Sequence, residues 1–416
     1  MADDPLPDAS PAEFPHWRRN TRALMVGSFL NPFGFTVAFP YLPLIMKDLG
    51  VEGDLEMIVG VVVGVFFLLS FGLAPVWGSM ADHFGRKAMI LRAGLGMSLG
   101  FTLMGLAPGL GSFIFFYVLV GTCNGYVPAA LALVATNTPR GSMGRALSGV
   151  QTGALLGTTC GPALGAWLAV SLPSSQWLYL ISGGACALAG LVALIWVRED
   201  FQRPPGPFRL HLVTDMLAIG RLPGMGPLLR LHFIVSMLLF GSTTAVSLFV
   251  LEMGQVPELL RGYSVEIWVG VATLALTIAS AVALPFWGRI LDRFDPARVM
   301  GLALIAGVVV ALPFPFVRDP LELTIARVAL GLFAVGLQPA GIRMVKEWAP
   351  AGMDGRALSM ATALNMLGNG GGPFLAGIIG SWWNLRAYFA VMAVLVLLGM
   401  MEWLWRGMHI QRAPAP

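Results

Sequence analysis

Twelve runs of about twenty mostly apolar residues follow one another along the chain, each bounded by charged residues or by prolines and glycines. An α-helix of about twenty residues crosses a bilayer and satisfies its own backbone hydrogen bonds there. The runs lack the short alternating pattern of membrane β-strands. We therefore expect an all-α integral membrane protein with twelve transmembrane helices. The predicted spans are 22–44, 57–78, 88–108, 112–134, 145–170, 175–197, 226–250, 264–287, 297–316, 321–343, 356–380 and 384–405.

The composition excludes several other classes of protein. Hydrophobic residues make up 56% of the chain and charged residues only 12%, which is not the composition of soluble domains. The three cysteines, Cys123, Cys160 and Cys186, lie inside apolar runs and give neither a disulfide framework nor a metal site. We expect no metal, no cofactor and no nucleic-acid partner.

The distribution of basic residues predicts the orientation of the chain. With a cytoplasmic N-terminus, 21 of the 26 Lys and Arg residues lie at the inner side, and only Lys47, Arg261, Arg318 and Arg386 lie outside. The positive-inside rule then places both termini in the cytoplasm. Residues 1–21 are predicted to be a disordered cytoplasmic tail and residues 406–416 a second cytoplasmic tail.

The chain contains an internal repeat. The longest internal connection, 198–225, is predicted to be a cytoplasmic linker between six-span halves at 22–197 and 226–405. A shift of 210 positions aligns Pro75-Val-Trp-Gly with Pro285-Phe-Trp-Gly, and a shift of 211 aligns the Gly-Arg-Ala-Leu-Ser of 144–148 with that of 355–359. Two parallel, pseudo-symmetric six-helix bundles are typical of transporters with a substrate site at the interface of the halves.

The segment after the second span carries a family resemblance. It reads Gly78-Ser-Met-Ala-Asp-His-Phe-Gly-Arg-Lys87 and resembles the loop signature of the major facilitator superfamily, while the similarity in spans and repeat extends over the whole chain. The resemblance implies a transporter that works by alternating access.

The same signature predicts a conformational latch. A carboxylate at Asp82 can lie against the positive N-terminal end of the eleventh span, which opens at Asp354-Gly355-Arg356. The second copy, at 288–295, departs from the pattern because Asp295 replaces the expected glycine. The predicted latch residues are Gly78, Asp82, Arg86, Lys87, Arg145, Asp292, Arg293 and Arg356.

The fifth span favours export over uptake. Its Gly157, Gly161, Pro162 and Gly165 resemble a glycine-proline signature typical of exporters in the family, although Ala166 stands where a final glycine is usual. Small residues four apart allow helices to approach closely, so ordinary tight packing explains the same pattern. The Pro40-Tyr-Leu-Pro43 of the first span is similar to drug and proton antiporters.

Arg327 is the one basic residue that lies within a span and away from its ends. Many exporters of the family carry a buried arginine four residues before a glycine in the fourth span, but Tyr117 holds that place before Gly121. Arg327 stands four residues before Gly331 in the tenth span, at the equivalent position of the second half. Inserting an arginine at mid-membrane costs about 2.5–3.5 kcal/mol of free energy on insertion scales. This cost favours a functional role for Arg327. It could bind an anionic group, tune a carboxylate, or pair with carbonyl groups.

Further candidates for a central cavity are polar or aromatic residues within spans. No Asp or Glu lies deep in a span, and Glu252 near an outer end is more simply explained as a solvated charge. Hydrogen bonding between helices is the alternative explanation for each polar residue. With Arg327 and Tyr117, the predicted substrate or coupling residues are Asn31, Phe35, Asn124, Gln151, Phe240, Thr243, Glu252, Trp268 and Asn365.

These observations favour a secondary exporter of amphipathic small molecules, coupled to protons or another ion. The alternative is an uptake symporter, or a lipid or organic-anion carrier, in which Arg327 binds an anionic group. Scattered histidines and the lack of a nucleophile constellation argue against an enzyme. We expect a monomer among membrane lipids, in a bacterial inner membrane.

Overall fold

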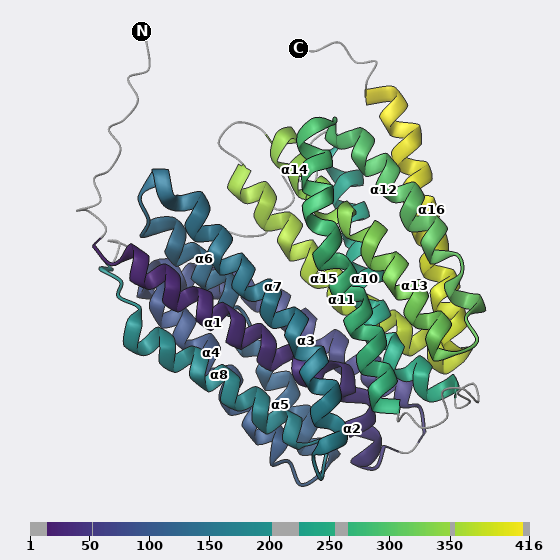
Figure 1. Cartoon of the computed structure of the whole chain (residues 1–416), viewed down its shortest axis with the longest axis horizontal. Coiled ribbons are helices and arrows are strands. Elements are labelled where there is room, and N and C mark those ends of the chain that lie inside the picture. The colour runs from purple at the N-terminus through teal and green to yellow at the C-terminus, as the bar shows by residue number, and fades with distance from the viewer. Residues whose placement is uncertain (1–14, 52, 202–223, 254–264, 350–353, 411–416) are drawn as a thin grey trace. The chain divides into compact units, whose positions relative to one another are not determined.

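The computed structural model describes residues 15–51, 53–201, 224–253, 265–349 and 354–410 (Figure 1). Most of the predicted linker and the ends of both predicted tails lie outside the described residues. The helices are α1 (Trp17–Ala38), α2 (Leu42–Asp48), α3 (Leu55–Phe84), α4 (Arg86–Gly105), α5 (Leu110–Cys123), α6 (Tyr126–Thr136), α7 (Arg140–Ser171), α8 (Trp177–Trp196), α10 (Met225–Met253), α11 (Val265–Arg293), α12 (Pro296–Ala311), α13 (Pro320–Phe333), α14 (Leu337–Trp348), α15 (Asp354–Trp382) and α16 (Leu385–Ile410).

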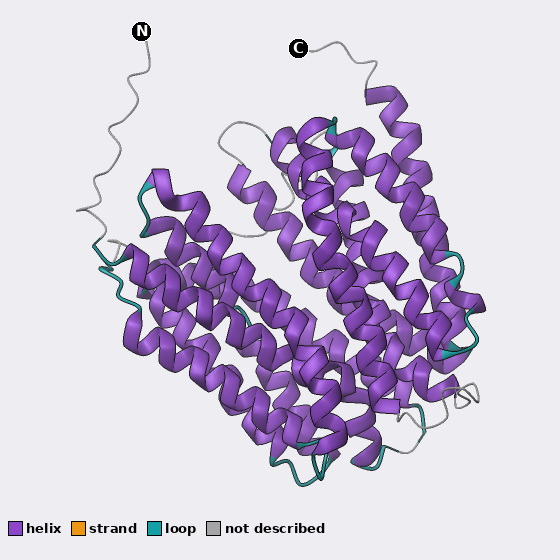
Figure 2. Ribbon diagram, in the orientation of Figure 1, coloured by secondary structure: helices purple, strands orange, loops and turns teal. Residues whose placement is uncertain are grey.

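The described residues form helices joined by turns, without strands (Figure 2). Eleven stretches among them are long and apolar enough to cross a membrane. Helix α15, which corresponds to the eleventh predicted span, is not one of the eleven, although it has 29 residues. Its glycine run at 370–372 and its two asparagines, Asn365 and Asn369, lower its hydropathy. The structure confirms the predicted all-α membrane fold.

Three predicted spans are interrupted helices. The first contains the 3-10 turn η2 (Phe39–Tyr41) between α1 and α2, and the tenth contains η5 (Ala334–Gly336) between α13 and α14. The fourth breaks between α5 and α6, where Gly125 has a φ of 127°, a conformation that favours glycine. The shift of about 210 positions between the halves makes the breaks in the fourth and tenth spans equivalent.

A tryptophan indole donates a hydrogen bond to a carbonyl group beside the break in the fourth span, and a second tryptophan does the same in the tenth span. The indole Nε1 of Trp77 on α3 donates to the carbonyl of Thr122 at 3.0 Å. The indole Nε1 of Trp287 on α11 donates to the carbonyl of Leu332 at 2.9 Å. Both the donors and the acceptors are 210 positions apart. The internal repeat is therefore a repeat of contacts as well as of sequence, and the indoles satisfy carbonyls near helix ends, which lack a full set of intrahelical partners.

Contacts divide the chain into two units, which we describe separately. Unit 1 comprises residues 1–38, 72–164 and 176–210, and unit 2 comprises residues 39–71, 165–175 and 211–416. In unit 1, α8 packs against both α1 and α4. Its core includes the fully buried side chains of Leu24, Ile90, Leu133 and Val197.

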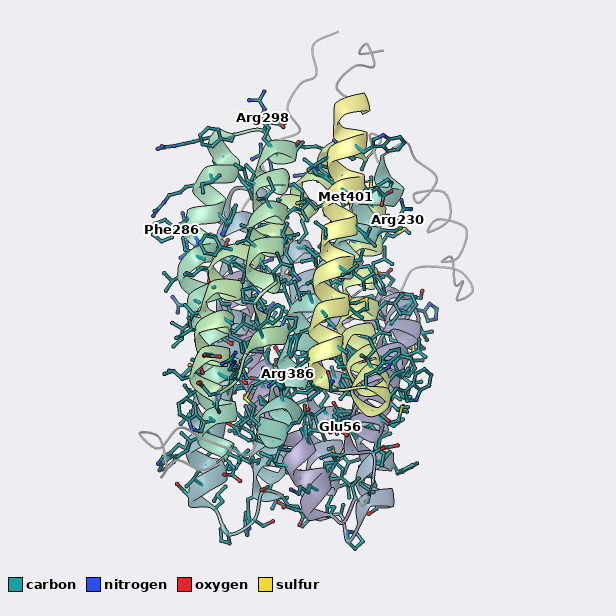
Figure 3. All side chains as sticks on the ribbon, turned by 90° about the vertical axis from the view of Figure 1, so that its right-hand side faces the viewer. Glu56, Arg230, Phe286, Arg298, Arg386 and Met401 are labelled. Carbon is teal, nitrogen blue, oxygen red and sulfur yellow. The ribbon has the colours of Figure 1, made fainter. Side chains whose placement is uncertain are left out.

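In unit 2, α10 packs against α15, and α11 packs against α13. Several charged side chains lie toward the ends of this unit, as expected for a membrane-spanning bundle. Figure 3 shows Arg230 and Arg298 toward one end of the unit and Glu56 and Arg386 toward the other.

Glycines allow α3 and α15 to cross closely within unit 2. A β-carbon at Gly60 would lie 2.7 Å from both the Cα of Gly377 and the carbonyl oxygen of Pro373. A β-carbon at Gly64 would lie 3.2 Å from the side chain of Phe374. Gly60 and Gly64 are four residues apart and so share one face of α3, which is the small-residue arrangement that lets membrane helices approach. This crossing, together with α2 and η2, ties part of the first half of the sequence to the second.

Replacing Gly60 by alanine should destabilise unit 2. The added methyl group has no room beside Gly377, and such overpacking costs about 1–3 kcal/mol. We expect a lower thermal unfolding temperature of the detergent-purified protein. Gly72→Ala is the matched control, because it lies on the same helix and a β-carbon there meets nothing within 4 Å. An unfolding temperature that falls equally in both variants would contradict the close crossing.

Candidate functional site

Arg327 lies in the interior of unit 2. It is on α13, and its side chain is completely buried, with a relative exposure of 0%. It is the largest side chain among those that are fully buried in the described part of the chain.

Two neighbouring helices supply the acceptors of the guanidinium. Its Nε donates to the carbonyl of Ala272 on α11 at 2.7 Å, and its Nη1 donates to the carbonyl of Ser242 on α10 at 2.9 Å. Its Nη2 donates to the hydroxyl of Thr243 on α10 at 3.3 Å. That hydroxyl in turn donates to the carbonyl of Leu239 at 3.2 Å. A carbonyl has two lone pairs, so these mid-helix oxygens can accept from Arg327 as well as from their own helix.

The glycine four residues further on makes these contacts reachable. A β-carbon at Gly331 would lie 2.5 Å from the carbonyl oxygen of Leu276 and 2.9 Å from the β-carbon of Ala279. Gly331 therefore brings α13 close to α11 one turn away from the guanidinium. The spacing of Arg327 and Gly331 explains how the arginine reaches the carbonyl of Ala272.

Within the described part of the chain, the positive charge of Arg327 has no carboxylate partner. None of the salt bridges in the described part of the chain includes it. Its acceptors are neutral, so they satisfy its hydrogen bonds without cancelling its charge. Two buried hydroxyls next in sequence to its partners, those of Thr244 and Thr273, have no hydrogen-bond partner. The helices that hold the guanidinium therefore also carry buried hydroxyl groups that can still donate.

The other residues predicted for the site in unit 2 take different positions. Phe240 packs against Phe39 and Phe67, with ring centroids 5.1 and 4.8 Å apart. Asn365 donates to the hydroxyl of Ser236 at 2.9 Å. Trp268 on α11 is buried.

Glu252 lies on the last turn of α10 rather than beyond the helix as the sequence predicted, and it is exposed. It interacts electrostatically with Glu56 on α3 and Arg386 on α16. These three residues form a charged group at one end of unit 2.

The residues predicted for the site in unit 1 are also dispersed. Asn31 is buried and donates to the sulfur atoms of Met97 and Cys186 at 3.5 and 3.6 Å. Tyr117, the counterpart of Arg327, is buried on α5, and Gln151 on α7 is exposed.

Phe35 packs against Phe101, with ring centroids 6.4 Å apart. Asn124 ends α5 at the break in the fourth span.

Arg92 also binds at this break, and no sequence motif predicts this contact. Its Nη1 and Nη2 donate to the carbonyls of Thr122 and Asn124 at 3.2 and 3.3 Å. Its guanidinium carbon lies 3.9 Å from the centroid of the Trp77 ring, which is close enough for a cation–π interaction. Arg92 was counted as an inner-end charge because it lies four positions into its predicted span. Its place in the sequence, about one and a half helical turns after Lys87, does not indicate which carbonyl groups or which ring it contacts.

The predicted latch residues of unit 1 lie around the turn between α3 and α4. Asp82 belongs to the last turns of α3, is exposed, and pairs with Arg86 at 3.3 Å. Gly78 lies one turn earlier, Lys87 lies in the first turn of α4, and Arg145 is exposed on α7.

In unit 2, Asp292 and Arg293 are exposed at the end of α11. The side chain of Arg356 lies outside the described side chains. The contact expected between Asp82 and the start of the eleventh span stays a prediction.

The glycines of the fifth span allow close contact with the first span. A β-carbon at Gly157 would lie 2.1 Å from the carbonyl oxygen of Phe29, and one at Gly161 would lie 2.0 Å from the hydroxyl of Thr36. Pro162 and Gly165 follow on α7. The tight-packing interpretation therefore holds in unit 1, and the direction of transport does not follow from it.

No group of three or more His, Cys, Asp or Glu side chains in the described residues is arranged to hold a metal ion. The three cysteines are free. Among the described residues, the candidate site is therefore a set of hydrogen-bonding and apolar groups around a buried cation.

Comparisons with known proteins agree with this architecture. The sequence profile of the Major Facilitator Superfamily matches residues 24–267 and 258–415. The multidrug resistance protein MdtG of Escherichia coli strain SE11 is 32% identical over 402 residues, which cover 96% of this chain and 97% of that protein.

Solved structures share the fold. The nucleoside transporter NupG aligns with a TM-score of 0.75 at 13% identity, covering 92% of this chain and 98% of its own. A bacterial homologue of the human lysosomal transporter Spinster, in an inward-facing and occupied conformation, aligns with a TM-score of 0.73 at 15% identity, covering 98% and 100%. The chain belongs to the Major Facilitator Superfamily, and it is a multi-pass membrane protein that transports small molecules as a secondary transporter and not an enzyme.

Proposed function

We propose that this protein exports amphipathic small organic molecules by proton-coupled antiport. The 32% identity to a multidrug resistance protein over nearly the whole of both chains supports export of this kind. The apolar and aromatic composition of the spans supports amphipathic substrates, because ligand pockets in proteins are mostly apolar with a few placed polar groups.

The buried guanidinium of Arg327 is the observation that carries the proposal for the site. A buried cation held only by neutral oxygens is costly inside a membrane, and such residues mark substrate or ion pathways. We assign it the role of binding substrate or of setting the protonation of a group that carries the coupling proton. Thr243 shares its hydrogen bonds and belongs to the same site.

The coupling proton requires a titratable group. Glu252, with Glu56 and Arg386 nearby, is the acidic group that we assign to proton entry or exit at the predicted outer end. No deeper carboxylate is present in the spans, so Glu252 is the acidic group that the proposal uses.

The same arginine supports a second candidate function, a carrier of organic anions. An anionic group would supply the counter-charge that the carbonyls of Ala272 and Ser242 cannot. This function needs no titratable residue near Arg327.

The proposal also covers the oligomeric state of the protein, its membrane and its conformational change. We propose a monomer in a bacterial inner membrane, in contact with lipids, with both termini cytoplasmic. The six-span halves would move against each other in alternating access, and Asp82 with the other latch residues would hold one of the two states.

Proton movement in proteoliposomes would test the direction and the coupling. With inside-out vesicles and an imposed proton gradient, a transported amphiphile should release protons from the lumen, as followed by a trapped pH-sensitive dye. Cationic, neutral and anionic amphiphiles are compared in the same preparation. The absence of proton movement with every compound, together with transport of an anion, would exclude proton antiport and establish the carrier function.

Replacing Arg327 by methionine should strongly reduce transport while the protein still inserts. Arg327→Lys should restore little, because one ammonium group cannot reproduce the planar fork that reaches two helices. Transport of a fluorescent amphiphile into inside-out vesicles gives the readout, and we expect a loss of about 100-fold, equivalent to the roughly 2.7 kcal/mol of two charge-assisted hydrogen bonds.

Arg298→Met is the matched control, since this arginine is exposed in the same unit. Its transport should equal that of the wild type. Undiminished transport by Arg327→Met would remove Arg327 from the site.

A further inference from the structure

Helix α4 begins directly after the latch turn, and a distant carboxylate binds its first two amides. The backbone N–H of Arg86 donates to Oε1 of Glu199 at 3.0 Å, and that of Lys87 donates to Oε2 at 2.7 Å. The first amides of a helix have no partner within the helix and carry its positive partial charge. Glu199 therefore acts as an N-terminal cap of α4, although it lies more than 110 residues away in the sequence.

Gly85 leaves the space that this cap occupies. Its φ is 94°, which L-residues with side chains rarely adopt. A β-carbon at Gly85 would lie 3.0 Å from Oε2 of Glu199 and 3.2 Å from the ring of Phe201. Gly85, the glycine of the loop signature, therefore allows both the sharp turn between α3 and α4 and the close approach of the Glu199 carboxylate.

The second repeat caps the equivalent helix in another way. Asp295 stands 210 positions after Gly85, and its carboxylate accepts the backbone N–H of Arg298 at 3.1 Å as the N-cap of α12. Asp295, which replaces the glycine of the family pattern, therefore caps α12 from a neighbouring position in the sequence. The second repeat needs no carboxylate from a distant segment, and α16 continues as a helix to Ile410 where the first repeat has Glu199.

The residues that follow α8, 198–201, hold unit 1 together at this end, and we name them the exit segment. The amide group of Asn20 on α1 donates to the carbonyl of Arg198 at 2.7 Å and accepts its backbone N–H at 3.0 Å. The ammonium group of Lys87 also donates to the carbonyl of Leu194 at 3.1 Å. One short segment therefore fixes the starts of α1 and α4, and it leads directly into the connection between the two halves.

We propose that Glu199 is a positioning residue for the transport cycle. Its carboxylate fixes the start of α4, and with it the turn that presents Asp82 and Arg86. Because Glu199 belongs to the exit segment, it links the connection between the halves to the latch turn. It touches no residue assigned to substrate binding, so it governs the rate of the conformational step and not the affinity for substrate. This inference rests on transport by alternating access and on no particular substrate or coupling ion.

Hydrogen exchange and transport kinetics test the proposal together. In Glu199→Ala the amides of the first turn of α4 should exchange at least about tenfold faster, because they lose the acceptors that close them. Peptides from α5 should exchange as in the wild type. The maximal transport rate should fall severalfold, and KM should remain unchanged. Glu199→Gln keeps one oxygen acceptor and should give intermediate values in both measurements.

Asp200→Asn is the matched control, because it removes the next, exposed negative charge and should alter neither readout. Unfolding temperatures of all variants identify any that do not fold. Unchanged exchange at α4 in Glu199→Ala would overturn the cap. Faster exchange with an unchanged maximal rate, or a change confined to KM, would overturn the positioning role. The exchange measurement uses no substrate, so it stands even if the proposed export is wrong.

Discussion

A guanidinium buried in a membrane protein must find oxygen acceptors from neighbouring helices, and Arg327 meets this requirement without an acidic residue. It joins α13 to the carbonyls of α10 and α11, and Gly331 allows α13 and α11 to lie close enough for those bonds. The packing of three helices in unit 2 is therefore tied to one side chain. Neutral acceptors satisfy its donors but leave its charge, and this remaining charge is the basis for the proposed role of Arg327 in transport.

The two repeats share the tryptophan contacts at their broken spans, but their buried and interfacial arginines lie at different positions. The hydrogen bonds of Trp77 and Trp287 at the broken spans are equivalent in both halves. By contrast, Arg327 corresponds to Tyr117, and Arg92 corresponds to an apolar residue. A broken helix needs its free carbonyls satisfied in either half. The first repeat uses an arginine for this purpose, whereas the second continues through a 3-10 turn.

Hydropathy and repeat spacing were sufficient to predict the helical fold, because the bilayer imposes the length of each span. They also singled out Arg327, since a lone charge inside an apolar run is conspicuous. The acceptors of Arg327 could not be predicted, because backbone carbonyls have no sequence signal. The capping role of Glu199 and the packing role of Gly60 could not be predicted either, for related reasons. A cap from a distant segment depends on tertiary structure, and the glycines at 60 and 64 have the same spacing as many packing glycines.

In the proposed site, the uncancelled charge of Arg327 bears on which substrates can bind. At about 4 Å and an effective dielectric constant near 20, two unit charges interact by about 4 kcal/mol. A cationic molecule beside Arg327 would therefore be opposed by an energy of that order, whereas an anionic group would be favoured by a similar amount. The charge would neither oppose nor favour a neutral amphiphile, which would bind through apolar contact. Under the proposed role of Arg327, a cationic substrate must bind at a distance from this residue, and the charge preference of the transporter depends on how near its substrates approach the guanidinium.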